Sequence, residues 1–143
     1  TGLRFFTVYG PWSRPDMAMY IFAEKINNDL PIPVFNYGKM QRDFTYIDDI
    51  TNGLKASIDK NFLCEIFNLG NNRCENLMDL IALIEQTLGR KAELKLMEIQ
   101  PGDVKKTFAD IEYSRDKLGY EPTTSITEGI PVFIRWYRDY TSN

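Results

Sequence analysis

The sequence predicts a single α/β unit spanning 1–143, because short apolar or aromatic runs alternate with segments of helical periodicity. The run at 3–9 is rich in aromatic and β-branched residues without polar alternation, which is typical of a strand buried on both faces. The segments 17–28 and 76–88 repeat apolar residues every three or four positions, as helices packed on one side do. No repeat, low-complexity tract or linker divides the chain, so we expect one domain.

Two strand–helix units fill the first half of the sequence. The first helix is followed by Pro31 and Pro33, which cannot continue it. Its inward face is expected to carry Met19, Phe22, Ala23, Ile26 and Leu30. A short strand at 33–35 leads to a turn at 36–38, and an extended segment at 42–46 leads into the second helix. The inward face of that helix is expected to carry Ile47, Ile50, Leu54 and Ile58.

The second half continues the alternation. A strand at 65–69 precedes the clearest helix of the sequence, at 76–88, which Gly89 terminates. The inward residues of this helix are expected to be Leu77, Leu80, Ile81, Ile84 and Leu88. A strand at 92–97 and a short helix near 113–118 follow.

The last helix is predicted from its apolar spacing and its start signal. Ser125 and Glu128 have the spacing of a capping box, and Pro131 should bend the first turns because it removes a backbone hydrogen bond. Its inward residues are expected to be Ile126, Ile130, Phe133, Ile134 and Tyr137.

Composition excludes several classes of function. The net charge of -3 gives no broad basic field, which argues against nucleic acid as a partner. No apolar run reaches the roughly 18–20 residues of a membrane span and no signal-peptide pattern opens the chain, so we expect a cytoplasmic protein. The sequence has no histidine, which excludes a Ser-His-Asp relay and a His-ligated metal. Cys64 and Cys74 are interpreted as two reduced thiols, with a disulfide or redox pair as the alternative.

The run from Arg4 to Met17 is the most informative feature of the sequence. The strand breaks at Gly10, and Arg14 and Asp16 come just before a helix, whose free N–H groups and dipole attract a phosphate or carboxylate. The alternative is a solvated arginine and a helix cap. Neither G-x-G-x-x-G nor G-x-x-x-x-G-K-[ST] occurs, so the usual phosphate-binding loops are missing.

Two further segments carry possible ligand contacts. Arg42 opens a strand-to-helix unit, where a guanidinium can bind a diphosphate bidentately, or else form an ion pair with Asp43 or a neighbour. The turn 100–103 ends in Asp103, which could accept a hydrogen bond from a ribose hydroxyl. Aspartate and glycine are also common in ordinary tight turns, which is the alternative.

Taken together, the segments 3–12, 14–18, 36–40, 42–50, 100–104 and 136–140 resemble one family over essentially the whole chain. They are similar to the C-terminal, substrate-binding part of extended short-chain dehydrogenase/reductases, the NAD-dependent epimerase/dehydratase family. The likeness is greatest to the UDP-glucuronate 4-epimerases. It implies a Rossmann-type α/β lobe with short strands and about four to five helices, in which residues 1–10 form a strand of the parent sheet.

The resemblance implies a reaction and its cofactor. In the family, a tightly held NAD takes a hydride from C4 of a UDP-sugar and returns it to the other face, with the tyrosine of a Tyr-x-x-x-Lys pair as acid and base. That pair and the glycine-rich dinucleotide loop are expected before Thr1. We therefore expect no catalytic residue in these 143 residues, no activity of the chain alone, and a homodimer formed through the missing N-terminal half.

The resemblance also assigns residues to the UDP-sugar. Thr7 and Arg14 are expected near the sugar carboxylate, where an arginine would distinguish glucuronate from glucose. The helix start at Asp16 and Met17 is expected to face the diphosphate, with Arg42 paired to it. We expect no metal site among these residues.

The remaining assignments concern the nucleoside and the cofactor. The main chain at Pro33 and Phe35 is expected to read the uracil edge, and Gln100 and Asp103 to reach the ribose and phosphate side. The residues expected to touch the nicotinamide end of NAD are Phe5 and Val8.

Two places depart from the family pattern. Tyr113 and Lys117 spell Tyr-x-x-x-Lys, but in the family this pair precedes the strand that 3–9 resembles, so we interpret it as part of a surface helix. Ser13 stands where the family pattern has glycine, which stiffens the loop that carries Arg14.

Three functions remain open at this point. The first is the UDP-binding lobe of a UDP-glucuronate-type 4-epimerase. The second keeps the fold and changes the reaction or sugar: a glucose epimerase, dehydratase or uronate decarboxylase. The third is a non-catalytic nucleotide-sugar-binding module, which would need no Tyr-x-x-x-Lys pair upstream.

Overall fold

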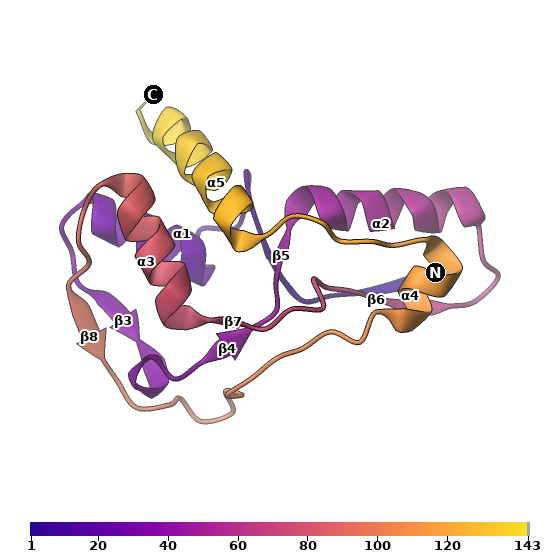
Figure 1. Ribbon diagram of the computed structural model, residues 1–143, viewed down its shortest axis with the longest axis horizontal. Coiled ribbons are helices and arrows are strands. Elements are labelled where there is room, and N and C mark those ends of the chain that lie inside the picture. Colours follow the sequence, from indigo (N-terminus) through magenta and orange to yellow (C-terminus); the bar gives the residue numbers. More distant parts are fainter. Residues whose placement is uncertain (143) are drawn as a thin grey trace.

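The structure is a computed structural model that describes residues 1–142, drawn in Figure 1. Within them, five α-helices alternate with short strands. The strands are β1 (Gly2–Phe5), β2 (Thr7–Tyr9), β3 (Ile32–Val34), β4 (Gln41–Arg42), β5 (Phe44–Tyr46), β6 (Ile66–Leu69), β7 (Glu75–Asn76) and β8 (Leu94–Leu96). The helices are α1 (Ala18–Asn27), α2 (Ile47–Lys60), α3 (Leu77–Leu88), α4 (Glu112–Leu118) and α5 (Ile126–Thr141), with a 3₁₀ turn at Phe35–Gly38.

The first strand of the chain changes partners at Phe6. β1 pairs in parallel with β6, and β2 pairs in parallel with β5. At the change, the Phe6 amide donates to the Leu69 carbonyl and the Thr7 amide donates to the Asp43 carbonyl. The two strand pairs therefore diverge at this point, and a divergence of parallel strands is where α/β folds place their ligands.

The prediction of one strand at 3–9 buried on both faces is wrong for its first half. The segment is split into β1 and β2, and of its residues only Tyr9 is fully buried. Phe5 is 51% exposed. β1 is paired to β6 along one edge, and its faces are covered only in part by the described residues.

Two hydrophobic clusters lie at opposite ends of the molecule. Figure 1 shows α3, β3 and β8 at one end, α4 and β6 at the other, and β4, β5 and β7 between them. The larger cluster is built from α1, α3, α5 and the strands near them, and the smaller one from Ile50, Phe67, Leu69, Ala109, Ile111, Leu118 and Tyr120. The divergence at Phe6 lies where the chain passes from one cluster to the other.

The helix at 17–28 is confirmed as α1, and its buried residues are Met19, Phe22, Ala23 and Ile26. Leu30, expected on the same face, is 50% exposed because the helix has already ended at Asn27. The predicted strand at 33–35 is found one position earlier as β3, and those at 65–69 and 92–97 are found as the shorter β6 and β8.

The predicted inward face of α2 is partly wrong. Ile50 is buried, whereas Leu54 and Ile58 are exposed. The buried side of the helix is instead Asp49, Ile50, Gly53 and Ser57. The helix is turned this way because it approaches its neighbours through Gly53, where a Cβ would lie 2.9 Å from Leu69 and Tyr120 atoms.

The helices of the second half agree with the sequence pattern. All five residues expected on the inner side of α3 are buried, and Gly89 closes this helix in the left-handed conformation. α5 buries its expected residues, and Ser125 and Glu128 form the predicted capping box. No helix within residues 1–142 is both long enough and apolar enough to cross a membrane.

Gly129→Ala is expected to destabilise the fold by about 2 kcal/mol, the cost of overpacking a filled core. Alanine favours a helix, but a Cβ at Gly129 would overlap the ring and hydroxyl of Tyr9, whose hydroxyl donates to the Ser125 carbonyl at 3.2 Å. Urea unfolding measures the change. Gly2→Ala is the matched control, because its Cβ would meet Ile66 at an ordinary 3.5 Å. Equal stability of the two variants would contradict the packing described here.

Candidate active-site lobe

A cavity of ≈ 270 Å³ opens beside the divergence of β1 and β2. Its walls come from β2, the N-terminal end of α1, β3, the 3₁₀ turn, β4 and the turn after Gln100. Of the residues predicted to bind the substrate, those that line it are Thr7, Asp16, Met17, Pro33, Phe35, Arg42 and Asp103. We call it the first cavity. The structure thus brings together residues that are up to 96 positions apart, from Thr7 to Asp103.

Arg42 is held at the wall of the first cavity. Its Nη2 lies 2.7 Å from Oδ1 of Asp103, and the two side chains are 17% and 32% exposed. Its Nη1 donates to the Gln41 carbonyl at 3.0 Å. The alternative of an Arg42–Asp43 ion pair is therefore wrong, and the carboxylate partner comes from the turn at 100–103. Gln41 fixes that segment, because its amide donates to Lys105 and its carbonyl accepts from Thr107.

A second cavity of ≈ 320 Å³ adjoins the first, because Met17 lines both. Phe5, Val8 and Arg14 belong to its wall, so the predicted cofactor residues and the predicted carboxylate-binding arginine lie around one space. We call this the second cavity. Gln100 lines neither cavity; its side chain is exposed, and its carbonyl accepts from the Asp103 amide within the turn.

Arg14 and Asp16 form an exposed ion pair at 2.6 Å, with side chains 74% and 65% exposed. The hydrogen bonds from Arg14 hold the pKa of the Asp16 carboxyl below its usual value. Within residues 1–142 no side chain caps α1, whose N-cap residue is Met17, so neither residue acts as the cap that the sequence left open. The start of α1 borders the first cavity through Met17 and Ala18, and helix N-termini carry N–H groups without partners inside the helix.

Ser13 has a buried side-chain oxygen that the sequence did not predict. Its Oγ is buried and has no hydrogen-bond partner within residues 1–142. The side chain lines the second cavity. A buried hydroxyl without a partner carries a desolvation cost, and the loop between β2 and α1 carries that cost at this position.

Asp43, which the sequence offered only as an alternative partner of Arg42, has a different role. It is fully buried, and its carboxylate accepts from the amides of Asn71, Asn72 and Ala109 at 2.7, 3.1 and 3.0 Å. The Thr45 hydroxyl adds a fourth bond at 3.0 Å. Asp43 therefore ties β5 to two loops directly behind the first cavity. The local sequence around Asp43 does not indicate these contacts, because the backbone partners lie far along the chain.

Residues 1–70, which include β1, β2, the Arg14 loop and Arg42, match the model of the NAD dependent epimerase/dehydratase family. The first half of the chain is therefore similar to this family. It is 50% identical over 136 residues to an uncharacterized protein of Methanocaldococcus jannaschii, covering 95% of this chain and 42% of the relative. It is 42% identical to UDP-glucuronate 4-epimerase 4 of Arabidopsis thaliana, covering 99% of this chain and 36% of that protein.

The solved structures show the same likeness. A UDP-glucuronic acid 4-epimerase from Bacillus cereus, in complex with UDP-glucuronic acid and NAD, superposes with a TM-score of 0.91 at 36% identity. The match covers 96% of this chain and 45% of that one. The chain thus spans less than half the length of the relatives that it matches. These likenesses confirm the α/β fold that the sequence predicts.

The second cavity fits one end of the dinucleotide that this family uses. Phe5 presents a half-exposed ring and Val8 an apolar wall, against which a flat ring such as nicotinamide can lie. Within residues 1–142, however, no glycine-rich loop opens a helix to hold a pyrophosphate. The residues that the structure describes therefore suit only the nicotinamide end of NAD.

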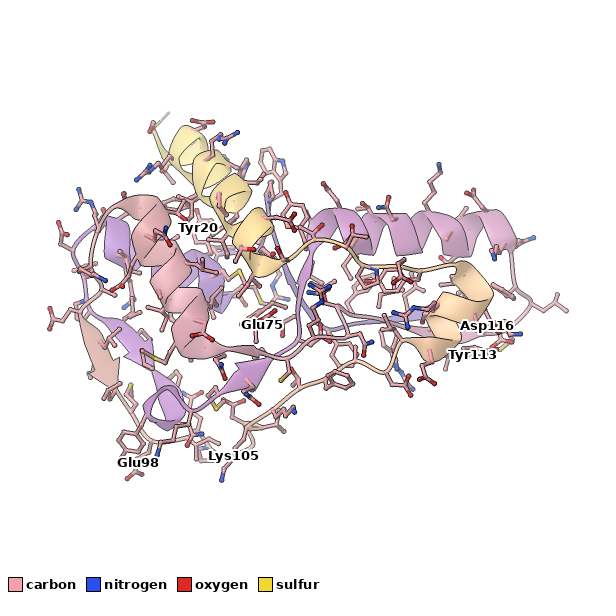
Figure 2. All side chains as sticks on the ribbon, in the orientation of Figure 1. Tyr20, Glu75, Glu98, Lys105, Tyr113 and Asp116 are labelled. Atoms are coloured by element: carbon pink, nitrogen blue, oxygen red, sulfur yellow. The ribbon has the colours of Figure 1, made fainter. Side chains whose placement is uncertain are left out.

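Neither cavity is lined by Tyr113 or Lys117. Figure 2 shows Tyr113 and Asp116 on α4, at the end of the molecule away from β3 and β8. The Tyr113 hydroxyl donates to Glu65 at 2.9 Å, which raises the pKa of the phenol, whereas a proton-transferring tyrosine needs a lowered pKa. Burial likewise raises the pKa of Tyr9, which borders the second cavity. These tyrosines are structural.

Within residues 1–142, no three Cys, Asp or Glu side chains are grouped closely enough to hold a metal ion. Cys64 and Cys74 are free thiols, as the first interpretation expected. The Cys74 thiol donates to the Thr107 carbonyl at 3.5 Å and thereby helps to hold the segment behind Arg42.

Proposed function

We propose that this chain is the UDP-sugar-binding part of an NAD-dependent nucleotide-sugar 4-epimerase, with UDP-glucuronate and UDP-galacturonate as its substrate pair. The supporting observation is the pair of adjoining cavities: Arg42, Asp103 and the N-terminal end of α1 surround the first, and Arg14 stands over the second. Together, these groups suit a ligand in which a nucleoside diphosphate is joined to an acidic sugar.

The nucleotide occupies the first cavity in this proposal. The diphosphate lies between the Arg42 guanidinium and the N-terminal end of α1, where free N–H groups and the helix dipole favour negative charge. Pro33 and Phe35 border the same cavity, and the main chain there receives the uracil edge. Asp103, held toward Arg42, accepts from the ribose, with Gln100 as a further contact from the same turn.

The sugar reaches from the first cavity into the second. Thr7 and Arg14 receive its carboxylate, because a guanidinium forms a bidentate ion pair with a carboxylate, whereas the hydroxymethyl group of glucose offers it a single neutral acceptor. Bound NAD supplies the hydride acceptor and donor for C4. Phe5 and Val8 orient that end of the cofactor and keep water from its face.

The same proposal places the acid–base pair and the dinucleotide loop in another part of the protein. These 143 residues bind and orient the substrate and perform no turnover by themselves. A homodimer formed through that other part stays a prediction. UDP-glucose is the competing sugar, since related solved structures also hold it.

Arg14→Ala is expected to abolish most of the preference of the chain for UDP-glucuronate over UDP-glucose. Arg14 lines the second cavity, and its loss removes the charged contact that only the uronate can make. Calorimetry with the two UDP-sugars measures the ratio of affinities. Arg90→Ala is the control, because Arg90 also forms an exposed ion pair, at 2.7 Å with Asp29, and lines neither cavity. An equal loss for both sugars would refute the carboxylate role, and no binding of either sugar would refute the proposal.

A further inference from the structure

Trp12 adopts a backbone conformation that a bulky side chain rarely takes. Its φ angle is +64°, in the left-handed region, and its side chain is among the most exposed aromatic rings of the described chain at 76%. It sits in the loop between β2 and α1, where the Ser13 amide donates to the Gly10 carbonyl at 3.2 Å. Such a conformation persists only where neighbouring contacts hold it.

Two rings of α5 hold Trp12. Its centroid lies 5.5 Å from that of Trp136 and 5.5 Å from that of Tyr140, and these two rings stack on each other at 5.2 Å. Trp136 is further packed against the buried Phe133 at 6.0 Å. We call Trp12, Trp136 and Tyr140 the aromatic clasp. Each pair lies within the range in which aromatic rings attract one another.

The clasp has a consequence for Arg14, which follows Trp12 by two residues. The Arg14 guanidinium bonds to Asp16 on the same loop, so this ion pair does not fix the loop to the rest of the molecule. The backbone between Gly10 and Met17 is tied by short-range turns, with the Met17 amide donating to the Arg14 carbonyl at 3.1 Å. The clasp connects this loop to the largest helix of the core.

We propose that the aromatic clasp positions Arg14 over the second cavity and thereby determines the preference for an acidic sugar. Trp136 and Tyr140 act as positioning residues: they lie on α5, more than 120 positions along the chain from Arg14, and line neither cavity. The inference rests on the proposed function, because it concerns how that site recognises a carboxylate. Without the clasp, the loop loses the contact that holds Trp12 in its left-handed conformation, and Arg14 moves with it.

Two measurements on the chain test this proposal, each with Tyr140→Ala and Trp136→Ala. The first is amide hydrogen exchange at Ser13 and Met17, which is expected to become about tenfold faster while the Gly129 amide at the start of α5 is unchanged. The second is the ratio of affinities for UDP-glucuronate and UDP-glucose, which is expected to fall about tenfold with UDP affinity retained. Tyr140→Ala is the safer variant for folding, because the Tyr140 side chain is 52% exposed.

Controls separate positioning from stability. Val132→Ala shortens another exposed side chain of α5 and is expected to change neither readout. Trp136→Phe keeps a ring in the clasp and is expected to restore most of the sugar preference. A purely structural role of the clasp would lower the affinity for both sugars together.

The outcomes distinguish this inference from the proposed function. Unchanged exchange at Ser13 and Met17 would overturn the clasp as the support of the loop. Faster exchange with an unchanged sugar ratio would overturn its role in specificity, and a ratio that falls in Arg14→Ala but not in the clasp variants would leave the proposed function standing. Equal affinities for both sugars in the unsubstituted chain would overturn the uronate specificity and this role together.

Discussion

Asp43→Ala is expected to lower the free energy of unfolding by about 4 kcal/mol, because several buried donors lose their acceptor and each costs roughly 1–3 kcal/mol. The Asp43 Oδ1 accepts from the Asn71 amide and the Thr45 hydroxyl, and its Oδ2 accepts from the amides of Asn72 and Ala109. The side chain is fully buried, so water does not replace it. Urea unfolding followed by circular dichroism measures the loss.

The amide variant and a neighbour sharpen this test. Asp43→Asn keeps the shape, but it replaces one acceptor oxygen by an NH₂ group that faces donors, so it is expected to destabilise nearly as much as alanine does. Asp48→Ala removes an exposed carboxylate five positions away and should cost little. A loss below about 1 kcal/mol for both Asp43 variants would show that these hydrogen bonds do not hold the loops together.

Arg42→Ala is expected to weaken UDP binding about 30-fold. Hydrogen bonds to a charged group contribute roughly 1.5–3 kcal/mol, and each 1.4 kcal/mol is a factor of ten in affinity. The guanidinium is 17% exposed at the wall of the first cavity, so solvent screens it little. Calorimetric titration with UDP measures the change, and titration with uridine gives the part that does not depend on phosphate.

Two substitutions control for charge and for geometry at Arg42. Arg90→Ala removes the same charge from the surface and should leave UDP affinity unchanged. Arg42→Lys keeps the charge but loses the planar pair of donors, so it should recover only part of the affinity. If alanine at position 42 weakened uridine as much as UDP, Arg42 would not be the diphosphate contact.

The parts of the fold that sequence predicts well are those set by local periodicity. α3 is an example: five apolar residues at helical spacing and a terminal glycine define its length, its buried face and its end. α2 shows the limit of this reasoning. Its apolar residues predict one face, but Gly53 allows a close approach to Leu69 and Tyr120, and that tertiary contact turns Leu54 toward solvent.

The candidate site divides in the same way. Arg14 and Arg42 are visible in the sequence because Arg14 lies between a strand and a helix and Arg42 opens a strand-to-helix unit, where anion sites are expected. The partner of Arg42 is not visible, because Asp103 is 61 positions away. The aromatic clasp and the bonds to Asp43 likewise join residues that only the fold brings together, and a single sequence contains no periodic signal for such pairs.

The ion pair between Arg42 and Asp103 determines how an anion enters the first cavity. The Asp103 carboxylate lies 2.7 Å from the guanidinium, so Arg42 is already paired before an anion enters. In the binding mode that we propose, an incoming phosphate binds by exchange: it displaces the carboxylate of Asp103, which is then free to accept from a neighbouring hydroxyl. A nucleotide supplies both groups at once, whereas an inorganic anion supplies only the first, and this difference favours the nucleotide.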